Sequence, residues 1–228
     1  RSIEERNKWD EYVVKESGPT NQELPSYAHA VGAVYRNSDP SDIVVTAAGG
    51  LVGEVVQIWK PKELNTFETE WGFSCMSYEI SGALGIKMAK PDQDVVVFVG
   101  DGSYLLNNSD IYSSVLYNQK LIIILCDNGG HMVINRLQLA KGGKEYICNL
   151  RAARATNLQF VDFENHAKSM GANAETVSST SELEAAFKRA KDSDKTYVIT
   201  IKTHGYEWLE GTAFWESPTL QDPITDNN

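Results

Sequence analysis

The chain has 228 residues, of which 42% are apolar and 23% are charged, and this composition suits a globular domain with a sizeable core rather than a disordered segment. Its net charge is -10 and its Lys and Arg residues are scattered, which argues against nucleic acid or an anionic membrane as a partner. Three widely spaced cysteines, four histidines without zinc-ligand spacing and the lack of a signal peptide or membrane-length apolar run predict a cytoplasmic protein with reduced thiols.

The first 24 residues are mostly polar and predict a linker or an N-terminal extension rather than part of a sheet. The chain does not begin with Met, so we expect an excised domain. The few strong apolar residues of this segment are Trp9, Tyr12, Val13 and Val14.

Residues 25–205 are expected to form one α/β domain. A helical pattern near Pro25 precedes a buried strand at 43–47, and a glycine-rich turn follows in which Gly49 and Gly50 either contact a phosphate or only turn the chain. Helices are predicted over 79–89, over 162–173 and after a capping box from Ser181 to Glu184, and the last strand over 196–202. This alternation predicts a doubly wound parallel sheet with helices on both faces.

Residues 95–128 contain an apolar strand ending in Gly-Asp-Gly, a helix-length stretch and a second apolar strand ending in Asp-Asn. Parallel strands would bring Asp101 and Asn128 to the same carboxyl edge, where open α/β sheets bind ligands. Carboxylate and amide oxygens suit Mg2+, which usually also binds substrate phosphates.

Glycines beside the carboxylate suit a phosphate as well as a metal. Gly100 and Gly102 allow close approach of a ligand, and the N–H groups of Gly102 and Ser103 open the next helix toward an anion. The segment therefore predicts a metal-bridged diphosphate. The alternative is a buried turn in which Asp101 only caps the helix.

The Gly100-Asp101-Gly102 triplet, followed after 24 residues by Asp127-Asn128, resembles the cofactor signature of thiamine diphosphate (ThDP) enzymes. The resemblance implies a ThDP-binding fold of the diphosphate-binding (PP) type, with ThDP and Mg2+ as cofactors. It also implies Asp101, Asn128 and the backbone carbonyl of Gly130 as Mg2+ ligands. The family more often has Asn where this chain has Asp127.

The loop before the Gly-Asp-Gly strand also resembles this family. By resemblance, Met76 would hold the cofactor in its bent shape, and the carbonyl of Ser74 and the N–H of Met76 would bind the pyrimidine ring. The alternative is that Met76 only fills a gap at a helix start. Glu79 is interpreted as a first-turn helix charge rather than a general base. His131 is expected near the site mouth, either touching substrate or lying at a surface.

Several strings, AAGGLVGEVVQIWK, EWGFSCMSYEI, INRLQ and HGYEW, resemble trihydroxycyclohexanedione hydrolases, a ring-opening family of myo-inositol catabolism. That resemblance implies hydrolysis of a carbon–carbon bond in a cyclic 1,2-dione to give 5-deoxy-glucuronate. The sequence of residues 129–138 differs from the one expected for that family after the Asp-Asn pair. Two alternatives to this function stay open. One is an acetolactate synthase-like carboligase or decarboxylase, and the other is a noncatalytic α/β assembly domain.

In ThDP enzymes a Glu from a pyrimidine-binding domain, usually of a partner subunit, activates the cofactor. No segment before the strand at 43–47 is long enough to be that domain. We therefore expect a homo-oligomer in which this chain supplies the diphosphate half of the site and is inactive alone. The tail at 206–228 is rich in aromatic residues and is expected to dock on a surface of this or another domain.

Overall fold

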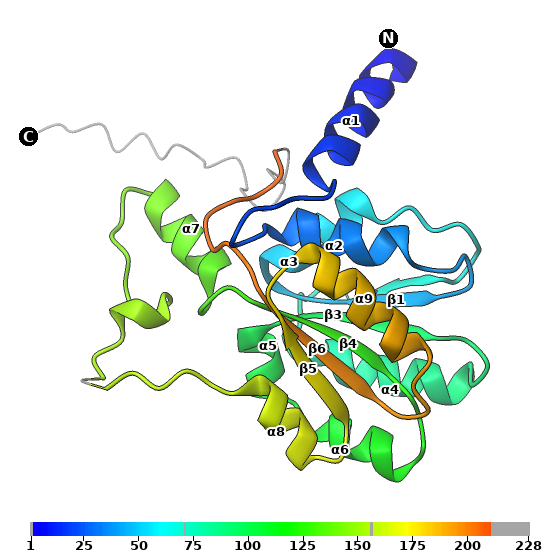
Figure 1. Cartoon of the computed structure of the whole chain (residues 1–228). Helices are drawn as coiled ribbons and strands as arrows, with labels where there is room; N and C mark the ends of the chain where they lie inside the picture. The colour runs from blue at the N-terminus through cyan, green and yellow to red at the C-terminus, as the bar shows by residue number, and fades with distance from the viewer. Residues whose placement is uncertain (1, 71, 156, 211–228) are drawn as a thin grey trace, which may run out of the picture.

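The computed structural model describes residues 2–70, 72–155 and 157–210, and in this part of the chain six parallel strands form a single sheet (Figure 1). Their order is β2-β1-β3-β4-β6-β5, and every neighbouring pair is parallel. The strands are β1 (Ile43–Thr46), β2 (Phe67–Thr69), β3 (Val95–Gly100), β4 (Ile122–Asp127), β5 (Asn173–Val177) and β6 (Tyr197–Lys202).

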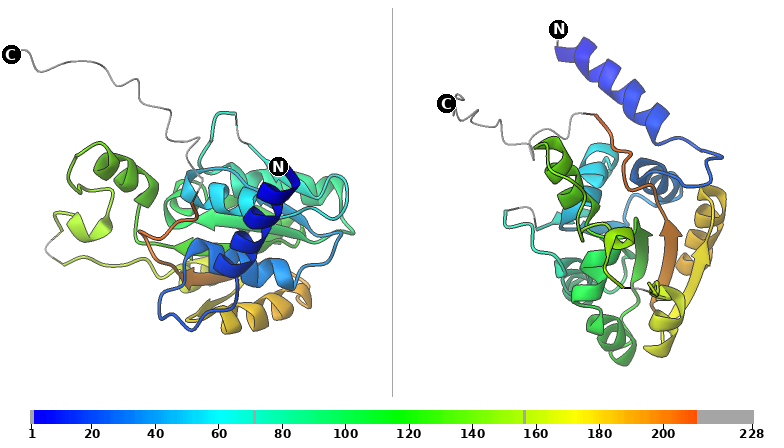
Figure 2. Two further views of the ribbon diagram at one scale, coloured as in Figure 1. Left: turned by 90° about the horizontal axis from the view of Figure 1, so that it is seen from above. Right: turned by 90° about the vertical axis from the view of Figure 1, so that its left-hand side faces the viewer.

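Helices cover both faces of the sheet, which confirms the predicted doubly wound fold (Figure 2). One face carries α2 (Tyr27–Arg36), α3 (Gly49–Ile58) and α9 (Thr180–Lys191). The other carries α4 (Tyr78–Ala89), α5 (Asp101–Leu106), α6 (Ser109–Leu116) and α8 (Phe163–Ser169). The remaining helices are α1 (Ser2–Glu16), α7 (Met132–Ala140) and a short 3-10 helix, η1 (Leu150–Ala152). None of the described helices combines the length and apolar character needed to cross a membrane.

The side chains of the strands contribute to two apolar layers, one on each face of the sheet. In β3, Val96 and Phe98 pack under α2 and α3, whereas Val95, Val97 and Val99 pack toward α4 and α6. All five side chains are buried, because a parallel sheet covered by helices on both faces excludes water from each side. The central strands therefore hold the turns at their carboxyl ends on a rigid base.

The topology places a crevice at the carboxyl edge. Strand β1 lies between β2 and β3, so the order of the chain through the sheet reverses there. Open α/β sheets bind ligands at such a reversal. In the register of β3 and β4, Gly100 pairs with Cys126, so Asp101 and Asn128 follow directly after the last paired residues.

The N-terminal segment is largely helical. Its residue pattern had not indicated a helix. Helix α1 extends away from the sheet (Figure 2), and its C-terminal end reaches the body of the domain through buried Val13 and the partly buried rings of Trp9 and Tyr12. Three of the four apolar residues noted in the sequence therefore form the docking surface of a helix, whereas Val14 is exposed.

Two further details differ from the sequence prediction. The capping box of α9 does not involve Ser181 and Glu184: Ser179 is the N-cap and accepts from the backbone N–H of Glu182. Glu184 instead pairs with Arg36 of α2 at 2.8 Å. The short edge strand β2 was not predicted, because its three residues are too few to show a period.

We expect opposite effects from two Gly→Ala substitutions inside helices. At buried Gly32 of α2, a Cβ would overlap the backbone carbonyl of Ser17, so Gly32→Ala should destabilise the fold by roughly 1–3 kcal/mol. At exposed Gly85 of α4 no heavy atom lies within 4 Å of a Cβ, so Gly85→Ala should stabilise by about 0.5–1 kcal/mol. Urea unfolding of both variants measures the difference, and equal effects would contradict the packing of α2 on Ser17.

Candidate functional site

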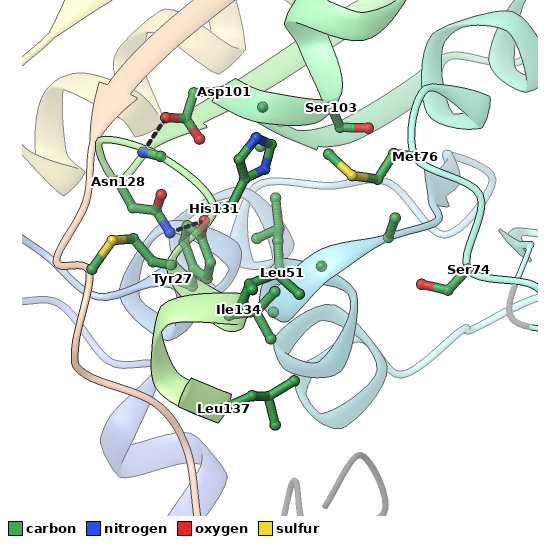
Figure 3. Close-up of a pocket in the computed structure, with 18 residues that line it drawn as sticks. Tyr27, Leu51, Ser74, Met76, Asp101, Ser103, Asn128, His131, Ile134 and Leu137 are labelled. Atoms are coloured by element: carbon green, nitrogen blue, oxygen red, sulfur yellow. Dashed lines mark hydrogen bonds between the residues drawn. The ribbon is translucent and has the colours of Figure 1, made fainter. Parts of the chain in front are cut away.

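A cavity of about 200 Å3 opens at the carboxyl edge of β1, β3 and β4 (Figure 3). It is lined by all eleven residues that the sequence analysis proposed for the site. They are Gly49, Gly50, Ser74, Met76, Gly100, Asp101, Gly102, Ser103, Asn128, Gly130 and His131. The residues come from four separate turns, so the fold brings together what is spread over more than eighty positions of sequence.

Asp101 and Asn128 lie together at the base of this cavity. Asp101 is buried at the start of α5, and its carboxylate accepts from the backbone N–H of Gly130 at 2.7 Å. The Asn128 amide donates through Nδ2 to the hydroxyl of Tyr27 at 2.6 Å. Its Oδ1 is buried and has no hydrogen-bond partner. A buried amide oxygen without a partner is costly, and a cation would satisfy it.

The turn after Asn128 needs glycine at both positions. Gly129 and Gly130 have φ of 81° and 140°, which other residues rarely adopt. A Cβ at Gly130 would also overlap the carbonyl of Cys148, whose oxygen accepts from the N–H of His131 at 2.8 Å. The turn is therefore fixed from both sides, by the Asp101 carboxylate and by residues 148–150.

The electrostatics of Asp101 fit a cation site. Burial raises the pKa of Asp101, and the nearby Asp127 carboxylate raises it further, although the N–H groups of Gly102 and Gly130 oppose this. A divalent cation would reverse the effect by stabilising the ionised form. Among the described residues no three His, Cys, Asp or Glu side chains gather into a metal site, so a cation here would need amide, carbonyl and ligand oxygens.

Beside the carboxylate, the start of α5 forms a small cradle. Gly100 is its N-cap, and a Cβ added to Gly102 would lie 2.7 Å from Cε1 of His131. The imidazole thus occupies the space above Gly102, where Figure 3 shows it between Asp101 and Met76. A diphosphate resting on Gly102 would contact His131 or displace it.

Ser103 and Glu79 hold the cradle to the neighbouring loop. The Ser103 hydroxyl donates to the Glu79 carboxylate at 2.7 Å and accepts from the N–H of Ser77 at 2.7 Å. Glu79 also accepts from the N–H of Ala48 at the end of β1. Burial raises the pKa of Glu79, which these hydrogen bonds partly offset. Glu79 is therefore a buried anchor between three segments rather than only a first-turn charge.

The loop that carries Met76 is shaped by its own hydrogen bonds. The Glu70 carboxylate accepts from the N–H groups of Phe73 and Cys75, and these bonds lower the pKa of Glu70. Ser74 and Ser77 adopt left-handed φ values of 49° and 80°. Met76 points into the cavity, opposite an apolar wall formed by Leu51, Ile134 and Leu137 (Figure 3).

Residues 47–201 match the family model of the thiamine pyrophosphate enzymes, C-terminal TPP binding domain, where TPP is another name for ThDP. The chain belongs to this family. Its cofactor is accordingly ThDP, and the cavity just described lies within the matched residues.

Two curated relatives of this TPP-binding domain are both named 3D-(3,5/4)-trihydroxycyclohexane-1,2-dione hydrolase. The protein of Halalkalibacterium halodurans is 39% identical over 74% of this chain and 27% of its own length. That of Bacillus subtilis is 34% identical over 91% of this chain and 34% of its own length. The chain thus spans about a third of the length of these relatives.

Among solved structures, benzoylformate decarboxylase from Polynucleobacter necessarius matches with a TM-score of 0.70 and 19% identity, over 84% of this chain and 35% of that one. The ThDP-dependent 4-hydroxybenzoylformate decarboxylase of Rhodococcus jostii matches with a TM-score of 0.68 and 18% identity, over 81% of this chain and 34% of that one. At these identities the likeness concerns the fold of the TPP-binding domain alone.

The segment Thr203–Glu210, which we term the strap, closes the back of the site. Its backbone N–H groups donate to the carbonyls of Asp127 and Pro25, to the Glu54 carboxylate of α3 and to the Tyr12 hydroxyl of α1. Trp208 packs so closely on Gly50 that a Cβ there would overlap the indole. The expected docking of the aromatic tail thus holds for Trp208, whereas Phe214 and Trp215 lie outside the described residues.

Tyr27 and Glu54 were not predicted as part of this TPP-binding domain's site, and no contact of Trp208 with the site was predicted. Each of the three reaches the site only through contacts across the fold. Glu54 is fully buried in α3, where its Oε1 accepts from the N–H of Leu209 at 3.0 Å and its Oε2 has no partner. Burial raises the pKa of Glu54 to about 7. A buried Glu in an otherwise apolar helix was the one signal available.

The raised pKa of Glu54 predicts how stability depends on pH. Between the ordinary value of 4.5 and about 7, the unfolded chain loses this proton before the folded one, so the Glu54 contribution to stability falls as pH rises and levels off above about 7. In Glu54→Gln this dependence disappears. We expect its stability relative to the native chain to rise by about 3 kcal/mol between pH 5 and 8.

Urea unfolding at several pH values measures this difference. Exposed Glu63→Gln is the matched control and should show no such trend. A stability difference between Glu54→Gln and the native chain that stays constant with pH would mean that Glu54 is ionised in the fold throughout.

Proposed function

We propose that the whole protein carrying this domain is a ThDP-dependent hydrolase that opens a trihydroxycyclohexane-1,2-dione by breaking a carbon–carbon bond, within inositol catabolism in the cytoplasm. The observation that carries the proposal is the shared name of the relatives, at 34–39% identity over 74–91% of the chain. The decarboxylases match at only 18–19% identity. Their likeness therefore does not favour decarboxylation.

In this proposal the cavity holds the diphosphate end of the cofactor. Asp101, Asn128 and the carbonyl of Gly130 bind Mg2+, and the N–H groups of Gly102 and Ser103 face the phosphates. The unpartnered Oδ1 of Asn128 and the open glycine surface support this assignment. When bound, ThDP supplies a carbon nucleophile and an electron sink for the bond that breaks.

The residues of this chain would then position and shield rather than transfer groups. Met76 and the wall of Leu51 and Ile134 exclude water from one side of the cavity and limit the shapes that a ligand adopts there. Ser74 offers its backbone to the pyrimidine ring. His131 stands at the mouth, where it is exposed and in reach of a substrate.

A pyrimidine-binding domain of the full-length chain, contributed by a partner subunit in a homo-oligomer, would complete the site with its activating Glu. The length of the relatives, about three times that of this chain, leaves room for such a domain. The surface around Phe73, which is 88% exposed beside Met76, is the expected contact.

The direct test is turnover by the full-length protein. With ThDP and Mg2+ we expect it to consume the cyclic dione and release a ring-opened carboxylic acid, with one water taken up for each bond broken. Pyruvate in place of the dione should give no acetolactate and no CO2. Consumption of pyruvate with no action on the dione would favour a carboligase instead.

The metal assignment predicts that Mg2+ and ThDP bind together. Three protein ligands do not complete the octahedral coordination shell of Mg2+, so Mg2+ alone should bind weakly. ThDP should raise the affinity of the protein for Mg2+ by supplying phosphate oxygens. Asp101→Ala should abolish this synergy, whereas the exposed Asp92→Ala should keep it. Calorimetry of the full-length protein measures both. Undiminished ThDP binding in Asp101→Ala would rule out this metal site.

A second prediction separates the role of Met76 from packing. In the full-length protein, Met76→Ala should lower the rate at saturating ThDP about tenfold or more and weaken ThDP binding much less, because the diphosphate anchor persists while the geometry at the reacting end is lost. Met88→Ala is the control, because Met88 is 58% exposed in α4, the helix that follows the Met76 loop. If ThDP binding were much weaker but the rate per bound cofactor unchanged, Met76 would have only a packing role.

A further inference from the structure

Tyr27 lines the cavity beside the candidate metal site. It is the first residue of α2, and its side chain is buried, with the hydroxyl 2.6 Å from Nδ2 of Asn128. Figure 3 shows the ring beneath Asn128, on the side away from Met76. In the part of the chain that the structure describes, this hydroxyl is the hydrogen-bond partner of the Asn128 amide.

The direction of this hydrogen bond matters, because an amide has two different ends. Nδ2 carries two donors and no acceptor, whereas a cation needs the oxygen. With Nδ2 bound to Tyr27, Oδ1 is left buried and without a partner. Rotating the amide by 180° would present N–H groups to the cation instead. By accepting from Nδ2, the Tyr27 hydroxyl pairs the donor end of the amide and leaves Oδ1 for the cation, which is the orientation in which Asn128 is a ligand.

Tyr27 is itself held by the strap. The Trp208 ring meets the Tyr27 ring edge-on, with centroids 5.6 Å apart, and the guanidinium of Arg136 lies over the Trp208 ring, 5.3 Å from its centroid. The Glu54 carboxylate fixes the next residue of the strap, Leu209, at 3.0 Å. Because these contacts confine the ring, the hydroxyl stays where the amide needs it.

We propose that Tyr27, buttressed by Trp208 of the strap, is a positioning residue that presents the Asn128 oxygen to the divalent cation. The inference rests on the proposed Mg2+ site. It adds a residue that binds neither metal nor cofactor and acts only through the amide that it orients.

The test is the Mg2+ concentration needed for half-maximal ThDP binding by the full-length protein, followed by tryptophan fluorescence or calorimetry. Tyr27→Phe keeps the buried ring and removes only the hydroxyl, so Nδ2 loses its partner and the amide is free to turn. We expect the Mg2+ midpoint to rise about tenfold, the effect of leaving one buried hydrogen-bonding group unpaired. Tyr35→Phe is the matched control, because the hydroxyl of Tyr35 in the same helix donates to the carbonyl of Lys60, remote from the site.

A purely structural role would give a different result. If the hydroxyl only stabilised the fold, Tyr27→Phe would lower the melting temperature of the protein without ligands and leave the Mg2+ midpoint unchanged. If it orients the ligand, saturating Mg2+ should restore ThDP binding and turnover to near the native values. An unchanged midpoint in a folded Tyr27→Phe protein would overturn the inference, and so would a ThDP deficit that excess Mg2+ does not rescue.

A second variant keeps the test decisive if Tyr27→Phe does not fold. Trp208→Leu retains an apolar contact but removes the edge that confines the Tyr27 ring, and we expect it to raise the Mg2+ midpoint by about threefold. An unchanged midpoint in this variant would then overturn the inference. Failure of the proposed Mg2+ site looks different, because the native protein itself would bind ThDP without any dependence on Mg2+. Failure of the proposed function appears only in turnover of the dione and leaves the Mg2+ midpoints of these variants unaffected.

Discussion

Gly100 of β3 pairs with Cys126 of β4, and the turns at the carboxyl edge of the sheet are placed relative to that pair. The register is strongly specified because both strands are buried on both faces, and a slip of one residue would exchange the two apolar layers. Asp101 and Asn128 follow within two residues of the pair. Their proximity is therefore a property of strand pairing, and flexible loops contribute little to it.

Buried carboxylates fasten the surrounding segments to this edge. Asp101 accepts from Gly130, Glu79 accepts from Ala48, and Glu54 accepts from Leu209. In each case the carboxylate bonds to the backbone of a segment far away in sequence. The same burial raises the pKa of all three acids. Burial thus disfavours the ionised forms of these acids, and a cation beside Asp101 would stabilise its carboxylate.

The sequence carried enough information for the fold and for eleven of the eighteen residues that line the cavity. Continuous apolar runs at β3 and β4 identified buried parallel strands, and the Gly-Asp-Gly and Asp-Asn turns at their ends are local patterns. The resemblance to ThDP enzymes added Ser74 and Met76, which no periodicity would have selected.

The rest could not be predicted because it depends on contacts across the fold. Tyr27 and Trp208 are separated by 181 positions and meet only because the strap passes the start of α2. Ser179 rather than Ser181 is the N-cap because α9 begins two residues earlier than its pattern suggested. The segment of α1 has too little apolar periodicity to indicate a helix, and only its docked end explains why it forms.

The position of the strap has a consequence for biosynthesis. Of the described segments, Thr203–Glu210 leaves the ribosome last, yet its partners are spread over the earlier chain, from Tyr12 and Pro25 to Glu54 and Asp127. Until it emerges, the ring of Tyr27 and the surface of Gly50 lack their cover, although every residue of the cavity itself has already been made. Because the strap is translated after the last strand, the pocket wall is completed only once the nascent domain has formed its sheet.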